Sequence, residues 1–342
     1  MKIAIHSVQF DGRGTGKTPY DYARGLQNLY QHEVVFVTSS LSTNEGLARI
    51  RKEFPVITYD KKVGMHDGQE IRDILSGIVD QQRIDFMQFL KYGNDDQITP
   101  DNCKTGIHCV FIMTEPHGDV YAGVSENLAK KFGHKLYVPH IIKAYPQTKD
   151  LRKELGIPTD ALVVGRHGGF DTFDVPFVHE AIRDALAVRK DLHFVFLSTK
   201  KFYEHERITY IPWVESEEDK FNVIHACDVM IHARMMGETF GLAVGEFSAA
   251  NKPVMTWRGL GCAGYDTAHV DILGANALLY NNRGDLQKIL LNLNRKFLKG
   301  RNWNVYTQTF SEANVTRQYS DVFLGSAPHA TKTAEALRSV AA

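Results

Sequence analysis

The chain has 342 residues, of which 43% are hydrophobic and 23% charged, and this is enough for about two soluble domains with buried cores. Lys and Arg together number 40, and Asp and Glu also number 40, so the formal net charge is zero. This balance argues against a protein that binds nucleic acid or a membrane surface through surplus cations.

In the first half of the chain, apolar runs alternate with amphipathic stretches. Runs rich in β-branched residues predict strands over 3–8, 34–38, 56–59, 85–90, 106–113 and 121–124. Helical spacing of apolar residues predicts helices over 19–30, 45–54 and 67–82. Alternation of this kind predicts a parallel sheet with crossover helices.

The pattern restarts after a polar, proline-bearing linker over 143–160. Strands are predicted over 161–166, 192–197, 228–232 and 253–256, and helices over 175–189, 215–226, 239–250 and 285–298. We therefore predict an α/β fold of two Rossmann-like, parallel-sheet domains that face each other across a cleft, with ligands bound at the loops that follow the strands. The predicted divisions are residues 1–145, 146–310, a helix over 311–324 that crosses back to the first domain, and a flexible tail over 325–342.

The sequence carries no sign of a membrane or secreted protein. No stretch approaches the roughly 18 uninterrupted apolar residues of a membrane span, and the first apolar run is too short for a signal peptide. The four cysteines form no CxxC pair and lie in or beside apolar sequence, which favours reduced thiols over a disulfide framework or a zinc site. We expect a cytoplasmic protein without an integral membrane segment.

The first strand is followed by a glycine-rich loop, Asp11 to Thr18, at the start of a helix. Only three residues separate Gly12 from Gly16, where a P-loop has four, and Pro19 interrupts a dinucleotide-binding pattern. Glycines before a helix let the backbone approach an anion. The loop therefore indicates either a phosphate contact or a tight turn without a ligand.

Two later loops carry charged side chains. Arg166 ends a predicted strand beside Gly168 and Gly169, where a guanidinium is well placed to bind a diphosphate, although a surface ion pair is the alternative. Glu238 and Glu246 stand eight residues apart, the first in a loop and the second in the following helix. Two carboxylates can accept hydrogen bonds from vicinal hydroxyls of one ligand, but the helix dipole and a solvated face would also explain them.

The block from Glu238 to Glu246, followed by Ala249 and 252–254, resembles the E-x7-E signature of retaining glycosyltransferases with the GT-B fold, and family 4 in particular. Weaker similarities occur in the same order along residues 1–324, at 114–118, 124–126, 138–140 and 164–166. The resemblance implies a GT-B fold with the acceptor on the first domain and a nucleotide-sugar donor on the second.

The resemblance also implies roles for single residues. Glu246 would hold the donor ribose, Glu238 would bind hydroxyls of the donor sugar, and Arg166 would neutralise the diphosphate. His117 would lie beside the anomeric carbon, so that His117, Glu238 and Arg166 are the expected catalytic residues. Further donor contacts are expected at Gly14, Thr15, Gly168, Arg234, Thr239, Phe240, Gly241 and Leu242.

The implied activity moves a sugar from a nucleotide-diphosphate donor to a hydroxyl of a carbohydrate or glycan acceptor, with retention, by a monomer or homodimer. No Asp-x-Asp triplet occurs, which disfavours a metal-dependent transferase, and no cofactor besides the donor substrate is expected. Asp171 stands where the family has a second diphosphate-binding Lys, so Arg234 or Lys200 would have to replace it, and His140 replaces the usual Asn. A GT-B nucleotide-sugar epimerase, a phosphorylase and a non-catalytic sugar-nucleotide-binding protein remain alternatives.

Overall fold

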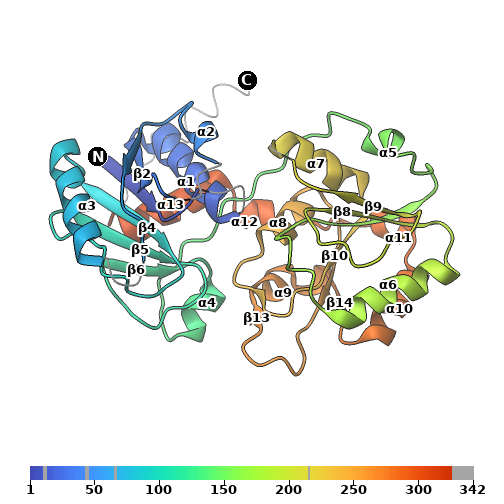
Figure 1. The fold of residues 1–342 in the computed structure, drawn as a ribbon. Helices are drawn as coiled ribbons and strands as arrows, with labels where there is room; N and C mark the ends of the chain where they lie inside the picture. The colour runs from blue at the N-terminus through green and yellow to red at the C-terminus, as the bar shows by residue number, and fades with distance from the viewer. Residues whose placement is uncertain (11–13, 43–45, 65–67, 215, 326–342) are drawn as a thin grey trace, which may run out of the picture.

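The structure is a computed structural model that describes residues 1–10, 14–42, 46–64, 68–214 and 216–325 (Figure 1). Its first unit is built on a six-stranded parallel sheet with the order β3-β2-β1-β4-β5-β6. The strands are β1 (Lys2–Ser7), β2 (Glu33–Ser39), β3 (Val56–Tyr59), β4 (Phe86–Lys91), β5 (Lys104–Cys109) and β6 (Val120–Gly123). Their side chains are mostly buried, as expected for a sheet that is covered on both faces.

The second unit repeats this arrangement with the order β14-β12-β10-β7-β8-β9. Its strands are β7 (Leu162–Arg166), β8 (Leu192–Leu197), β9 (Ile208–Ile211), β10 (Val229–His232), β12 (Val254–Trp257) and β14 (Ala277–Tyr280), with β11 (Gly237–Glu238) paired to β13 (Asp266–Thr267) in a small separate sheet. In both units the strand order reverses beside the first strand, which is the Rossmann arrangement predicted from the alternation of elements. The second unit therefore reverses its order between β7 and β10.

Helices surround both sheets (Figure 1). The first unit has α1 (Gly14–Tyr30), α2 (Leu47–Ile50), α3 (Gly68–Gln82) and α4 (Glu126–Lys131). The second has α5 (Leu151–Glu154), α6 (Pro176–Val188), α7 (Glu217–Ala226), α8 (Leu242–Ala249), α9 (Ala268–Leu273), a 3-10 turn (Gly274–Asn276), α10 (Arg283–Asn292), α11 (Arg295–Lys299) and α12 (Tyr306–Thr309). No helix in the described part of the chain is both long and apolar enough to cross a bilayer.

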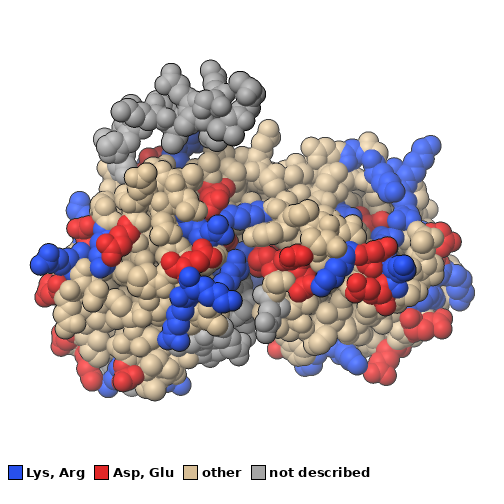
Figure 2. Space-filling model, turned by 90° about the horizontal axis from the view of Figure 1, so that it is seen from above, with Lys and Arg blue, Asp and Glu red and all other residues tan. Residues whose placement is uncertain are grey.

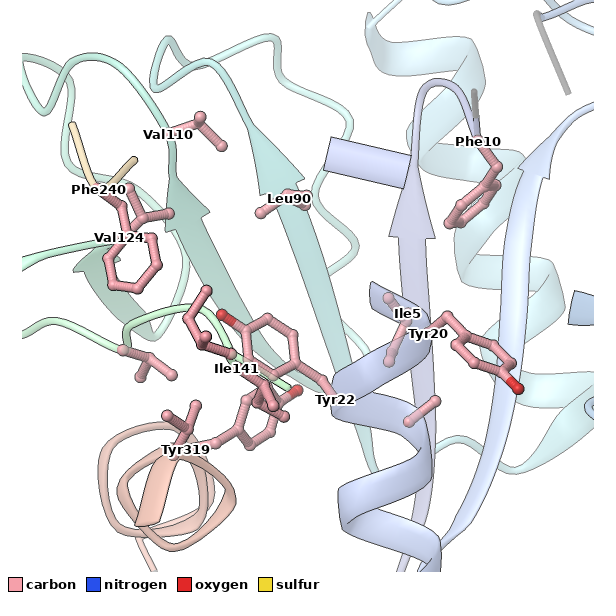
Figure 3. Packing of buried hydrophobic residues seen from close by; sticks show 14 of the residues in the cluster. Ile5, Phe10, Tyr20, Tyr22, Leu90, Val110, Val124, Ile141, Phe240 and Tyr319 are labelled. Atoms are coloured by element: carbon pink, nitrogen blue, oxygen red, sulfur yellow. The ribbon is translucent and has the colours of Figure 1, made fainter. Parts of the chain in front are cut away.

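The last helix, α13 (Glu312–Phe323), lies beside α1 of the first unit, although the chain reaches it from the second. Tyr319 of α13 donates a hydrogen bond to Gln88 Oε1 in β4, and its ring packs 5.4 Å from that of Tyr22 in α1 (Figure 3). Burial of both aromatic rings attaches α13 to the first unit. Of the tail expected over 325–342, all but Gly325 lies outside the described residues.

Some predicted elements have different bounds. The helix predicted over 285–298 is two helices, because Leu293 is extended and the Asn294 side chain caps α11 by accepting from Phe297 N. The helix predicted over 239–250 begins at Leu242, because Gly241 takes a left-handed φ of 87°. The strand predicted over 106–113 ends at Cys109, and β9 and β14 were not predicted.

Candidate functional site

The charged residues singled out in the second half gather at the carboxyl ends of its strands. Arg166 is the last residue of β7, Arg234 follows β10, and Glu238 ends the short strand β11. Since the strand order reverses between β7 and β10, these residues lie at the switch point where open α/β sheets bind ligands.

Arg166 is a buried cation that has no carboxylate partner among the described residues. Its side chain is held by four acceptors: Nη1 donates to Thr199 Oγ1 at 2.5 Å and to Ser198 O at 3.4 Å, and Nη2 donates to Thr172 Oγ1 at 2.8 Å and to Gly169 O at 2.9 Å. No acidic side chain of the described residues lies within ion-pair distance of it. Burial lowers the pKa of Arg166 to about 10 because nothing nearby fully balances its charge. An anionic ligand at the carboxyl end of β7 would balance the charge of Arg166.

Gly168 makes room for this guanidinium. Its φ is +153°, which side chains rarely adopt, and a Cβ built there would lie 3.0 Å from Arg166 Nη2. The glycine predicted as a donor contact therefore lies directly against the cation, and any ligand contact it makes would be through its backbone.

Glu238 is ionised and held by two basic groups. Arg234 Nη1 donates to its Oε2 at 2.7 Å, and His232 Nε2 lies 3.2 Å from its Oε1. Burial would raise the pKa of Glu238, but the hydrogen bond with His232 and the charge of Arg234 lower it to about 2. His232 was not predicted as a site residue, because a lone His in a buried strand gives no signal of its partner.

The residues between the two glutamates form the start of α8. Thr239 and Phe240 are buried, Gly241 is the N-cap, and Leu242 is the first helical residue. The Phe240 ring packs against His140 at 5.1 Å and Phe310 at 5.0 Å, in the interior where the two units meet (Figure 3). Any contact of Phe240 with a donor would therefore be through its backbone.

Glu246 lies in a buried ion cluster that joins the two units. Its Oε1 accepts from Lys220 Nζ at 2.6 Å and from Lys17 Nζ at 3.0 Å, and its Oε2 lies 3.0 Å from His167 Nε2. Lys17 also lies 2.8 Å from Glu217. Burial would raise the pKa of Glu246, but Lys220 and Lys17 hold it well below its usual range.

The partners of Glu246 were not predicted as functional residues. Lys17 lies in α1 of the first unit, three residues after Gly14, where the phosphate contacts of Gly14 and Thr15 were expected. The only available signal was its position in the Gly-Lys-Thr run of the first loop, whereas Lys220 and Glu217 lie on a helix whose sequence carries no motif.

The contacts found for His117 lie within the first unit. Its Nε2 lies 3.1 Å from Lys91 Nζ, its Nδ1 lies 2.7 Å from Glu115 O, and its ring packs 5.6 Å from that of Tyr121. It lines a cavity of about 380 Å³ whose lining residues all belong to the first unit. None of the contacts found for His117 reaches the second sheet.

The residues considered as a second diphosphate cation differ in exposure. Asp171 and Lys200 are both exposed and lie 3.9 Å apart as a loose surface pair. Arg234 is largely buried and bound to Glu238. Arg234 is therefore the better placed of the two cations.

His117 and two nearby carboxylates, Asp95 and Asp96, could offer atoms to a metal ion. Lys91 already forms an ion pair with Asp96 and lies against His117, so that its ammonium takes the position of a cation in this group. The donor set therefore does not fit a metal.

No protein-family model matches the sequence, and no curated protein sequence matches it either. Solved structures match nearly the whole chain. Anabaena Alr3699/HepE in complex with UDP and glucose has a TM-score of 0.71 at 14% identity, covering 96% of this chain and 100% of that one. WaaG, a glycosyltransferase involved in lipopolysaccharide biosynthesis, has a TM-score of 0.68 at 14% identity, covering 95% and 100%.

A third similar structure is a putative UDP-N-acetylglucosamine 2-epimerase from Listeria monocytogenes, with a TM-score of 0.60 at 13% identity, covering 96% of this chain and 98% of that one. At such identities the likeness concerns the fold. The two six-stranded parallel sheets and these matches establish that the chain has the GT-B fold.

Proposed function

We propose that the protein is a glycosyltransferase that moves a sugar from a nucleotide-diphosphate donor to a hydroxyl of a carbohydrate acceptor. The observation that carries this proposal is Arg166, a buried guanidinium at the switch point of the second sheet that has no carboxylate partner in the part of the chain that the structure describes. The fold supports it, because the similar protein HepE has been solved with UDP and with UDP-glucose.

Charge development in the reaction explains the proposed roles. As the glycosidic bond to the diphosphate breaks, negative charge grows on the leaving phosphate and positive charge on the anomeric carbon. Arg166 would stabilise the leaving diphosphate, with Arg234 as the second cation, and the ionised Glu238 would accept hydrogen bonds from sugar hydroxyls. We further propose retention without a metal ion, on the resemblance of Glu238–Glu246 to the E-x7-E signature.

The proposed contact between Glu246 and the donor ribose requires room beside the basic groups that already surround this carboxylate. Both of its carboxylate oxygens are already close to basic groups, namely Lys17, Lys220 and His167. A ribose hydroxyl can bind Glu246 only beside these groups or after one of them moves. Lys17 is the one that comes from the other unit, so donor binding is expected to change the contact between the units.

A direct test is the binding of nucleotides to wild type and Arg166→Gln. A ligand that binds only the folded state raises the melting temperature, so one of UDP, GDP, ADP or their sugar conjugates should stabilise the wild type. We expect Arg166→Gln to lose this shift and Arg166→Lys to keep part of it, because the charge remains without the guanidinium fork. Arg283→Gln, an exposed cation of the same unit, is the matched control. An equal shift in Arg166→Gln would refute the proposed diphosphate site.

The second candidate function is a nucleotide-sugar epimerase, favoured by the similarity to the putative 2-epimerase. An epimerase converts its nucleotide sugar without any acceptor, whereas a transferase releases nucleoside diphosphate in proportion to added acceptor. Incubating the stabilising nucleotide sugar with and without a glycan mixture, and following both products, separates the two functions.

A further inference from the structure

A second cavity, of about 620 Å³, lies at the amino-terminal ends of the strands of the second sheet, opposite the candidate donor site. Three of its lining residues precede strands: Thr159 comes before β7, Asp228 before β10 and Lys252 before β12. At the other ends of these strands, Arg166 is the last residue of β7 and Arg234 follows β10. β7 has five residues, and a strand rises about 3.3 Å per residue, so this cavity is about 15 Å from the candidate donor site. No candidate catalytic residue lines it.

The side chains of this cavity carry more positive than negative charge. Five cations line it, against two carboxylates: Arg152, Lys153, Lys252, Arg295 and Lys299, with Asp150 and Asp228. These five cations come from α5, α11 and the turn before β12. The fold therefore brings them together from distant parts of the sequence.

Both carboxylates are already committed to other groups. Asp228 Oδ2 lies 2.8 Å from Arg152 Nη2 and accepts from Val163 N at 2.9 Å, and its Oδ1 lies 3.4 Å from Arg295 Nε. Asp150 caps α5 by accepting from Lys153 N at 3.3 Å. Neither carboxylate forms an ion pair with Lys252, and Asp228 is shared with two arginines.

Lys252 is the most buried of the cavity's lysines, and it has no ion-pair partner among the described residues. Its Nζ donates one long hydrogen bond, of 3.3 Å, to His225 O near the end of α7, and a helix-end carbonyl carries only a fraction of a charge. Among the described residues, no ion pair involves Lys252, Lys153 or Lys299, and Arg295 Nε is buried without a hydrogen-bond partner. Burial lowers the pKa of Lys252, and the opposing effects of Cys227 and Asp228 do not offset it, since the charges of Arg152 and Arg295 add to the lowering.

We propose that this cavity binds the phosphate group of a small phosphorylated metabolite, with Lys252 as its central contact. A phosphate dianion balances the surplus cations and accepts several charge-assisted hydrogen bonds from ammonium and guanidinium groups. The cavity is within the size range of small-molecule sites and is larger than one phosphate needs, so a phosphate carried on a sugar fits it better than free phosphate. This inference does not depend on the proposed transferase activity.

The experiment is titration calorimetry at constant ionic strength with ribose 5-phosphate, inorganic phosphate and ribose as probes. We expect saturable binding of ribose 5-phosphate with one site outside the donor site, and none of ribose. Lys252→Met should weaken this binding about tenfold, as the loss of one charged hydrogen bond implies. Inorganic phosphate that binds as tightly as ribose 5-phosphate would identify free phosphate as the ligand of the same site.

Three further variants make the result decisive. Arg166→Gln tests the donor site, and Lys190→Met removes an exposed lysine outside the cavity; both should leave the binding unchanged. The double variant Lys153→Ser/Lys299→Ser changes only exposed lining residues, so it decides the question if Lys252→Met does not fold. The proposal is overturned if no phosphate probe binds saturably, or if binding is lost in Arg166→Gln and kept in both cavity variants.

Discussion

At the scale of single residues, the candidate site is defined by how each buried charge is balanced. Glu238 has two basic partners, and its carboxylate therefore stays ionised. The hydrogen bonds of Arg166 to described residues all go to neutral acceptors, and the carboxylates of Glu238 and Asp174 act on it without forming an ion pair. Because burying an unbalanced charge is costly, a protein keeps such a group where a ligand provides the missing charge.

Lowering the pH should destabilise the protein partly through protonation of Glu238. Its pKa is lowered from 4.5 to about 2 in the folded protein, so its ionised form contributes stability that is complete above about pH 4.5 and is lost as the pH falls toward 2. We expect the free energy of unfolding of the wild type to fall more steeply between pH 5 and 2.5 than that of Glu238→Gln. Urea denaturation across this range measures both, and parallel pH profiles would contradict the prediction.

Gly168→Ala should disturb the donor site through Arg166. The new methyl group would meet Arg166 Nη2 at 3.0 Å and force either the guanidinium or the loop to move, so we expect nucleotide binding to weaken about tenfold. Gly156→Ala is the matched control, because Gly156 also has a positive φ, of +65°, but a Cβ there meets nothing within 4 Å. The control should lose about 1 kcal/mol of stability and no affinity. Equal nucleotide affinities in both variants would argue against a role of the Arg166 geometry.

At the scale of elements, the contact between α1 and α13 requires a glycine in α1. A Cβ at Gly25 of α1 would lie 2.2 Å from Thr316 Oγ1 of α13, and Thr316 is fully buried. Only glycine lets the two helices approach this far. The contact matters for function because α1 also carries Lys17 to the second unit.

Gly25→Ala is therefore expected to destabilise the protein by about 1–3 kcal/mol, the usual cost of overpacking a core. Gly77→Ala serves as its control, since Gly77 is also within a helix but a Cβ there meets nothing within 4 Å. That variant should gain up to about 1 kcal/mol from helix propensity. Chemical denaturation compares the two, and a Gly25→Ala variant as stable as wild type would show that α13 can shift on α1 at little cost.

At the scale of the whole molecule, ion pairs between described residues bridge the two units at two places. Lys17 reaches Glu246 and Glu217 in a buried cluster, whereas Lys131 of α4 lies 2.6 Å from Asp266 at a more exposed position. On the face shown in Figure 2, both charge signs are interspersed, which agrees with a neutral chain that lacks a polybasic surface on this side. The buried bridge is the one that involves the candidate site.

Lys17→Met should cost about 3–5 kcal/mol, because Glu246 and Glu217 would keep their buried charges with one cation fewer. Lys131→Met breaks the more exposed bridge and should cost less than about 1 kcal/mol. Urea denaturation of the two variants gives the comparison. Similar losses in both would mean that the buried cluster contributes no more than a surface pair.

The sequence by itself determined the fold class and the place of Arg166. Apolar runs and helical spacing are local properties, and a parallel strand buried on both faces needs little more than its own residues to be recognised. Strands such as β9 and β14, whose residues are mostly only partly buried, lack this signal and were missed. The position of Arg166 at a strand end also follows from local pattern, because the end of a strand is where the apolar run stops.

Only the tertiary structure decided what surrounds the charges. Lys17 and Glu246 are 229 residues apart, and no local pattern encodes that one neutralises the other. In the same way, the environment of His117 depends on Lys91, and the surplus charge around Lys252 depends on segments brought together by the ends of three strands. Electrostatic partners are set by distance in space, and the fold alone brings such distant residues within a few ångströms.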